Sequence, residues 1–465
     1  MQISSRRSRV WGYAAQALNI GAGLVLLVPV AAYLPPEAVG LWLVFVTLST
    51  MAQLLELGFQ PSIGRQVAYV KAGVLTLQAT GISPPLSKGP MDQALAQDLL
   101  MAARWIYRWV ALLVLLFFVA LGTPYIATLV QQDPSALNAA YGAWFLFAAG
   151  QVVQFYFGYL SAWLMGCGAI VEASKVTVLS RLIFITFGSL ACVAGFGLLG
   201  LGAAALLAAI VGRWIAYQFS RQVDGVTFCA PSSQSTKRRR ELVRILWHNA
   251  SRQGAVQLGS FLALRANLLI ASSVLGLATA ASYGITMTVL LALMTFSMTM
   301  LNLHLPGINS AQSNGNRAQI TSLYGDALIQ AALVFVGGVS LLMFIGQPLL
   351  NTLGSRSQLL PTSQLLVLSA VILLELNHAM AGTYLTTRNH VPFVRAAVVS
   401  GAAICVLSLL SVYWLGIWGL IAAQGLVQLA YNNWRWPILA MRDIDGSYVQ
   451  LFVQGWKHMT RGGRR

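Results

Sequence analysis

The residues that decide the fold are found within the first sixty. Residues 10–34, VWGYAAQALNIGAGLVLLVPVAAYL, are followed by Pro35 and Pro36 and then by residues 39–60, VGLWLVFVTLSTMAQLLELGFQ. A helix that crosses a membrane needs about 20 mostly apolar residues, and each stretch is long enough. Two consecutive prolines favour an interruption between two helices. This part of the sequence therefore predicts two membrane-spanning helices joined by a tight turn.

The same pattern recurs along the whole chain. Of its 465 residues, 57% are hydrophobic and 9% are charged, whereas a soluble protein has about 25% charged residues. This composition excludes a soluble globular enzyme and predicts an all-α polytopic membrane protein. We expect about 12 transmembrane helices, at residues 10–34, 39–60, 103–122, 139–163, 176–196, 199–219, 249–275, 280–304, 327–350, 361–386, 395–415 and 417–439.

The basic residues predict the orientation of these helices. The net charge is +17, and the basic residues gather in both tails and in alternate loops. Arg265 is expected to be the only one near a helix centre. Because cytoplasmic loops of membrane proteins are rich in Lys and Arg, we expect both termini to be cytoplasmic. The positive charge then faces anionic membrane lipid, and no nucleic-acid partner is expected.

The predicted helices divide into two bundles of six. Residues 1–219 and 249–440 form the bundles, 220–248 form a basic cytoplasmic linker, and 441–465 form a basic cytoplasmic tail. Six spans in each half predict a parallel repeat. Residues 34–42 and 275–283 correspond at a constant offset, and Pro61 and Pro306 are expected to close the second and eighth helices. Paired bundles of this kind bind substrate near the midplane, where the halves meet.

Polar side chains form stripes on the first, second, seventh and eighth helices. The stripes allow two interpretations: they line a central hydrophilic cleft, or they hold helices together through hydrogen bonds. Gln151, Gln424, Gln428 and Asn432 on other helices border the same cavity or tie each bundle together. The candidates for binding a polar substrate are Gln16, Asn19, Gln53, Gln60, Gln257 and Asn302.

Three charged residues are expected to lie away from the ends of the predicted spans. Arg265 costs about 3 kcal/mol in a membrane unless it finds water, a partner or a ligand. It either anchors an anionic substrate or pairs with a carboxylate such as Glu375 or Glu56. Each of these carboxyls either exchanges a proton or an ion during transport, or forms an interhelical hydrogen bond or ion pair. His378 follows Glu375 by three residues and is interpreted as a packed histidine.

The sequence contains no pattern of residues that indicates catalysis. It lacks a nucleotide-binding loop and any known hydrolase or metalloprotease motif. Its four cysteines lie far apart, which favours neither a disulfide framework nor a metal site. We therefore expect a transporter that is not an enzyme, has no cofactor, and is driven by an ion gradient or by the substrate gradient.

Two segments resemble the polysaccharide flippases of the Wzx type, which belong to the MOP (multidrug/oligosaccharidyl-lipid/polysaccharide) exporter superfamily. The first runs from Tyr33 to Trp42 and continues through 54–65, where Glu56 takes the family's acidic place and Arg65 its basic one. The second is 268–283, although Ala266 and Asn267 stand where the family often has aspartate and arginine. The resemblance implies a V of two bundles, like that of multidrug and toxic compound extrusion (MATE) proteins, whose cationic cleft holds a sugar–diphosphate headgroup.

These observations lead to a functional hypothesis. The protein is predicted to flip undecaprenyl-diphosphate-linked oligosaccharide, a repeat unit of O-antigen, capsule or exopolysaccharide, from the inner to the outer leaflet by alternating access. Arg265, Arg65 and Arg252 attract the diphosphate, and the six amide side chains bind sugar hydroxyls. Expected partners are this glycan lipid, membrane lipid and other membrane proteins of polysaccharide assembly.

Two alternatives remain. The first is an ion-coupled multidrug antiporter of the same superfamily, whose cleft should be acidic. The second is a membrane-embedded polysaccharide polymerase or ligase, which usually needs a large outer loop with catalytic arginines or histidines. The longest predicted outer loop, 123–138, has only Asp133 as a charge, which argues against the second alternative.

Overall fold

The computed structural model describes residues 6–74, 76–78, 92–132, 137–223, 235–388, 392–444 and 451. Within these ranges every regular element is a helix, and ten helices are long and apolar enough to cross a membrane. The predicted fold class, an all-α polytopic membrane protein, is confirmed. The chain forms two compact units, Met1–Leu258 (unit 1) and Gly259–Arg465 (unit 2).

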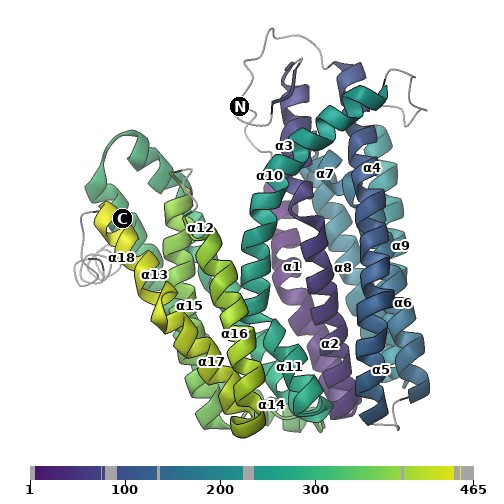
Figure 1. Ribbon diagram of the computed structural model, residues 1–465, viewed down its shortest axis with the longest axis vertical. Coiled ribbons are helices and arrows are strands. Elements are labelled where there is room, and N and C mark those ends of the chain that lie inside the picture. Colours follow the sequence, from purple (N-terminus) through teal and green to yellow (C-terminus); the bar gives the residue numbers. More distant parts are fainter. Residues whose placement is uncertain are drawn as a thin grey trace. The chain divides into compact units, whose positions relative to one another are not determined.

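Unit 1 is a bundle of long helices that run side by side (Figure 1). The closest packing is between α1 and α8, α6 and α9, and α8 and α9. Its elements are α1 (Arg6–Tyr33), α2 (Pro36–Gln53), the 3-10 turn η1 (Leu54–Glu56), α3 (Phe59–Lys71), α4 (Gln93–Phe117), the π-helical turn η2 (Phe118–Gly122), α5 (Thr123–Gln132), α6 (Leu137–Tyr156), α7 (Gly158–Gly166), α8 (Ile170–Val193), α9 (Gly197–Gln222) and most of α10 (Ser235–Leu264).

Unit 2 is a second bundle, in which α12 packs on α13, α15 on α18, and α16 on α17. It begins within α10. Its further elements are α11 (Ala266–Val274), α12 (Leu277–Ser313), α13 (Arg317–Leu341), the π-helical turn η4 (Leu342–Gly346), α14 (Gln347–Thr352), α15 (Thr362–Thr386), α16 (Val394–Leu415), α17 (Ile417–Ala430) and α18 (Asn432–Ile444).

The first predicted turn is confirmed. Helix α1 ends at Tyr33, and Pro36 begins α2 at a position where the missing N–H of proline costs no hydrogen bond. Two other predicted spans, 139–163 and 417–439, are each divided into two helices, at Phe157 and at Tyr431. The seventh predicted span is likewise divided at Arg265.

The prediction that two prolines close helices is wrong. The second helix ends earlier, at Glu56, because Leu57 and Gly58 adopt left-handed backbone angles, with φ of 52° and 77°. Pro61 lies in the first turn of α3, and Pro306 lies inside α12, which continues to Ser313. Membrane helices tolerate an internal proline because neighbouring groups satisfy the freed carbonyl.

The third and ninth spans contain matching irregularities. Each has a π-helical turn directly before a Gly-x-Pro sequence, 122–124 in unit 1 and 346–348 in unit 2. Proline cannot donate to the carbonyl four residues earlier, and the wider π turn accommodates this defect. In unit 1 the Thr123 hydroxyl donates to the Phe118 carbonyl at 3.0 Å. The matching π-helical turns support the parallel repeat. The predicted outer loop 123–138 is shorter than expected, because residues 123–132 form the helix α5.

Small residues allow the closest helix contacts in both units. A Cβ atom on Gly202 of α9 would lie 2.5 Å from the Ala143 carbonyl oxygen of α6. In unit 2 a Cβ on Gly259 would lie 2.5 Å from the backbone of Ala397. Helices in membranes associate through such close packing.

The segments outside the helical bundles are only partly described. In the predicted linker 220–248, α9 continues to Gln222 and α10 begins at Ser235, while residues 224–234 lie outside the described part of the chain. Of the predicted tail 441–465, only 441–444 and 451 are described. The predicted domain boundaries stay a prediction.

Candidate functional site

Arg265 lies at the break between α10 and α11. Its backbone N–H donates to the Phe261 carbonyl at 2.9 Å, and its own carbonyl accepts from Leu268 at 3.2 Å. The side chain is half-buried. Among the described residues no carboxylate forms an ion pair with it, and Glu375, in the same unit, pairs with His378 instead. Arg265 is therefore a mid-span cation without a counter-ion among the described residues of unit 2.

The predicted substrate-binding amides are all accessible within their own units. Gln16 and Asn19 on α1, Gln53 at the end of α2, Gln60 on α3, Gln257 on α10 and Asn302 on α12 are exposed, as is Arg65 on α3. Arg252 lies in α10, and its side chain is outside the described part of the chain. Of these seven exposed residues only Asn19 has a side-chain hydrogen bond to another described residue, Arg181.

The stripes contribute little to holding the described helices together. On α12 the hydroxyls of Thr288, Thr295 and Thr299 each donate to the carbonyl four residues earlier in the same helix. Among the described members, Ser49 donates to Gln151 of α6 at 2.9 Å, Glu56 accepts from Tyr107 of α4, and Asn19 accepts from Arg181 of α8. Helix association explains these contacts, whereas it does not explain the other exposed amides.

Glu56 belongs to a polar cluster inside unit 1. The Tyr107 hydroxyl of α4 donates to its carboxylate. Arg213 of α9 interacts electrostatically with both Glu56 and Tyr107, and its guanidinium donates to the Ser161 hydroxyl at 2.8 Å. The negative charge of Glu56 therefore has a hydrogen-bond donor and a nearby cation within the same unit.

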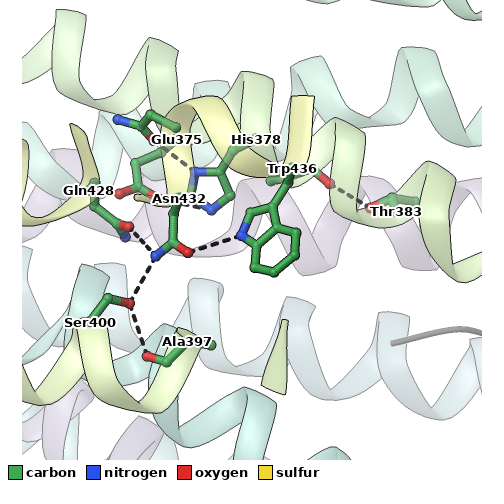
Figure 2. Close-up of polar contacts among 10 residues, drawn as sticks. Glu375, His378, Thr383, Ala397, Ser400, Gln428, Asn432 and Trp436 are labelled. Carbon is green, nitrogen blue, oxygen red and sulfur yellow. Dashed lines mark hydrogen bonds and ion pairs between the residues drawn. The ribbon is translucent and has the colours of Figure 1, made fainter. Parts of the chain in front are cut away.

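Glu375 belongs to a different kind of cluster inside unit 2, shown in Figure 2. It is 3% exposed, and one carboxylate oxygen lies 3.6 Å from His378 Nε2. The other oxygen has no hydrogen-bond partner among the described residues. His378 Nδ1 lies 2.9 Å from the Asn433 side-chain oxygen. No arginine or lysine forms an ion pair with this carboxyl in the part of the chain that the structure describes.

Asn432 connects the same region to α16 and α18, as Figure 2 also shows. Its amide nitrogen donates to Gln428 at 2.7 Å and to Ser400 at 2.9 Å, and its oxygen accepts from Trp436 at 2.9 Å. Gln424, one turn before Gln428, is fully buried, and neither of its amide atoms has a described partner. These amides tie the bundle together and surround the Glu375 region with buried polar groups.

Two arginines inside helices were missed by the sequence reasoning. Arg181 lies near the middle of α8 and Arg213 lies inside α9, so Arg265 is not the only basic residue within a span. The predicted fifth span began at residue 176, which placed Arg181 near a cytoplasmic end, whereas α8 begins at Ile170. Arg181 and Arg213 each lie more than two turns after the first residue of their helix, Ile170 and Gly197. A search of the sequence for charged residues at such positions would have found both arginines.

The described residues contain no group of three or more His, Cys, Asp and Glu side chains that could hold a metal ion. Their polar chemistry is that of arginines, amides and separately placed carboxyls, among them Glu56, Glu375 and the buried Asp326 of α13. Such groups can bind an anion and sugar hydroxyls, and the carboxyls can exchange protons.

Comparisons with known proteins identify the fold. No protein-family model and no curated protein matches the sequence. Among solved structures, the chain is similar to a multidrug resistance MATE family transporter of the MOP superfamily in its inward-facing conformation, with a TM-score of 0.70 and 14% identity over 93% of this chain and 98% of that one. The chain is also similar to a multidrug resistance MATE family transporter in its outward-facing conformation. The TM-score is 0.57 and the sequence identity is 15%, over 94% of this chain and 95% of that one.

A MOP superfamily transporter from Pyrococcus furiosus gives a TM-score of 0.55 and 15% identity, over 95% and 96% of the two chains. This chain has the fold of the MOP superfamily transporters. The resemblance found in the sequence is confirmed at that level, and the Wzx-type branch stays a prediction. Since one fold serves many substrates, the substrate has to be argued from the site.

Proposed function

We propose that this protein is a flippase that moves undecaprenyl-diphosphate-linked oligosaccharide from the inner to the outer leaflet of a bacterial inner membrane. In this proposal transport proceeds by alternating access, and both termini are cytoplasmic. The observation that carries the proposal is the Arg265 guanidinium, which lies within a span and has no described carboxylate partner. A cation in this position is costly without a counter-ion, and a planar guanidinium suits phosphate oxygens.

The carboxyls of the spans support an anionic substrate over a cationic one. Glu56 has Tyr107 and Arg213 as partners, and Glu375 is buried beside His378. Neither is an exposed, uncompensated acid of the kind that would attract a cationic drug. The Pyrococcus furiosus relative is described as having a binding pocket of reverse polarity that suggests a different function. Pocket polarity is thus a basis for distinguishing functions within this fold.

The exposed amides fit the sugar part of the proposed substrate. Gln16, Asn19, Gln53, Gln60, Gln257 and Asn302 each offer both donors and an acceptor, which match the hydroxyls of a glycan. Arg65 and Arg252 would attract the diphosphate near the entrance. Apart from Asn19, which accepts from Arg181, these exposed amides form no side-chain hydrogen bond to another described residue and remain available to a ligand.

Glu375 is the better of the two candidates for coupling to protons. It lacks a permanently charged partner, and one of its oxygens is unpaired among the described residues. A buried carboxylate in this setting is costly, and binding a proton removes the cost. Glu56 already has the Arg213 guanidinium nearby, which stabilises its ionised form. We therefore assign Glu56 a structural role.

The proposal can be tested by complementation of a bacterial strain that lacks its own flippase for a matching glycan. Arg265→Ala is expected to reduce surface export of the glycan by at least tenfold while the protein remains in the membrane. Arg356→Ala, which removes an exposed arginine outside the spans, is the matched control and should leave export unchanged. Full export by the Arg265 variant would contradict the role of Arg265. Resistance to cationic drugs without glycan export would favour the multidrug antiporter.

A further inference from the structure

The seam between α1 and α8 in unit 1 is tightly packed over part of its length. Gly188 of α8 lies against Leu26 of α1, where an added Cβ would be 2.9 Å from the leucine side chain. Ala15 and Ala22 of α1 and Cys192 of α8 are also buried. The seam is therefore closed on the side of Leu26 and Gly188.

Arg181 lies on the same stripe of α8 as the residues of this seam. At about 100° per residue, Ser174, Gly188 and Cys192 lie within about 20° of its direction. All three are buried, whereas Arg181 is exposed. Arg181 is thus an accessible residue on an otherwise buried stripe, and we call its surroundings the opening.

Asn19 marks the same opening on α1. It shares a face with Ala15 and Leu26, which are buried, and yet it is exposed. On this face a Cβ added to Gly12 or Gly23 would meet no atom within 4 Å. Asn19 and Arg181 thus form an accessible polar contact between α1 and α8, with free space beside Gly12 and Gly23.

The contact leaves the outer part of the arginine available. Arg181 Nε lies 3.4 Å from the Asn19 side-chain oxygen, so the two terminal NH2 groups are not used in this bond. Within the described part of the chain no carboxylate forms an ion pair with Arg181. The paired NH2 groups of a guanidinium match two oxygens of a phosphate.

A second cation lies on the same helix. Lys175 is about 9 Å from Arg181 along α8, and its ammonium group is 5.8 Å from the Trp11 ring of α1 and 5.7 Å from the Phe219 ring of α9. Lys175 points about 120° away from Arg181 around α8, so it adds positive charge to this part of unit 1 without facing the Arg181–Asn19 contact.

We infer that Arg181 and Asn19 form a subsite for the phosphate of a polyprenyl diphosphate lipid. This inference rests on the proposed function and adds a second anion contact, in unit 1, to that of Arg265 in unit 2. On the same side of α8, Ile185 and Phe184 point within about 40° and 60° of the direction of Arg181, and both are half-buried. A ligand at this place therefore meets both a guanidinium and an apolar surface, which fits a phosphate that carries an apolar chain.

The experiment measures binding of undecaprenyl diphosphate, without a glycan, to the purified full-length protein in detergent by native mass spectrometry. Arg181→Gln is expected to weaken binding by about tenfold, and Asn19→Ala by a smaller factor. Arg181→Lys keeps the positive charge and loses the paired NH2 groups of the guanidinium. Its affinity for undecaprenyl diphosphate should lie between that of Arg181→Gln and that of the unmodified protein. Arg356→Gln is the matched control and should bind normally. The melting temperature of each variant shows that it is folded.

Three comparison ligands identify the source of the phosphate. Undecaprenol should bind weakly and independently of Arg181, and inorganic pyrophosphate and phosphatidylglycerol should not compete at equal concentration. Competition by pyrophosphate would overturn the assignment to a lipid, and competition by phosphatidylglycerol would reduce the subsite to a general anionic-lipid contact. Binding that is unchanged in a folded Arg181→Gln protein would overturn the subsite while leaving the proposed function intact. No binding by the unmodified protein would instead contradict the proposed function.

Discussion

The two units have the same kind of architecture and surround the carboxyl groups Glu56 and Glu375 with different partners. In unit 1, Glu56 shares its cluster with a phenol and a guanidinium, those of Tyr107 and Arg213. In unit 2, Glu375 is surrounded by amides and a histidine and keeps one oxygen unpaired among the described residues. A nearby fixed cation stabilises an ionised carboxylate, whereas neutral dipoles alone leave most of its desolvation cost uncompensated. The comparison assigns a structural role to the first carboxyl and proton exchange to the second.

The largest expected difference concerns gradient-driven transport. Glu375→Gln should reduce proton-driven transport of the glycan lipid by at least tenfold, because the amide cannot take up and release a proton. Exchange of substrate without a gradient should continue. Glu56→Gln should keep more than half of the driven rate. Transport into vesicles with and without an imposed pH gradient measures both variants, and the reverse pattern would overturn the comparison.

The charge balance of unit 1 can be measured by a double-mutant cycle. Arg213→Gln should lower the free energy of unfolding by about 2 kcal/mol, because a half-buried carboxylate loses its nearby cation and Ser161 loses a charged donor. Adding Glu56→Gln should restore a large part of this loss, since the uncompensated charge is then gone. Denaturant unfolding in detergent gives the energies. Simple additivity of the two changes would show that the groups do not interact.

The polar network of unit 2 should depend on its central amide. Asn432→Ala removes three hydrogen bonds and should lower the free energy of unfolding by about 2 kcal/mol. Asn351→Ala, on the exposed surface of α14, provides the control and should change stability by less than about 0.5 kcal/mol. Equal effects of the two substitutions would mean that the Asn432 network contributes no more than a surface contact.

The smallest effect is expected for the phenol of unit 1. Tyr107→Phe removes one hydrogen bond to Glu56 and retains Arg213, so the loss should be about 1 kcal/mol. Tyr413→Phe, at a position that is 72% exposed, should be neutral. Melting temperatures of the two variants provide the test. A loss as large as that of Arg213→Gln would mean that the phenol, and not the guanidinium, compensates Glu56.

Local features of the fold were predictable from the sequence. The turn after Leu34 follows from two adjacent prolines, and the apolar spans follow from composition. The helix breaks at Arg265 and Tyr431 carry no such local signal, because neither residue is a glycine or proline. Pro306 is a residue that usually interrupts a helix, and yet it lies within the continuous helix α12. Breaks of this kind depend on packing between distant helices.

The candidate site was predictable in part. Exposed amides on α1, α2 and α12 agree with the helical spacing of the polar residues. The partners of Glu56 could not be found from spacing, because Tyr107 lies 51 residues further along the chain. Arg181 was missed because a span edge shifted by a few residues changes an interfacial arginine into one inside the membrane. The depth of a charge is therefore only as reliable as the edge of its helix.

The central claim is that the protein moves an anionic lipid-linked headgroup. It is tested most directly by reconstituting the purified protein in vesicles and following two substrates in parallel, a fluorescent undecaprenyl-diphosphate-linked sugar and a cationic dye. The account predicts protein-dependent translocation of the sugar lipid, its loss in Arg265→Ala, and no protein-dependent movement of the dye. Transport of the dye together with no transport of the sugar lipid would contradict it.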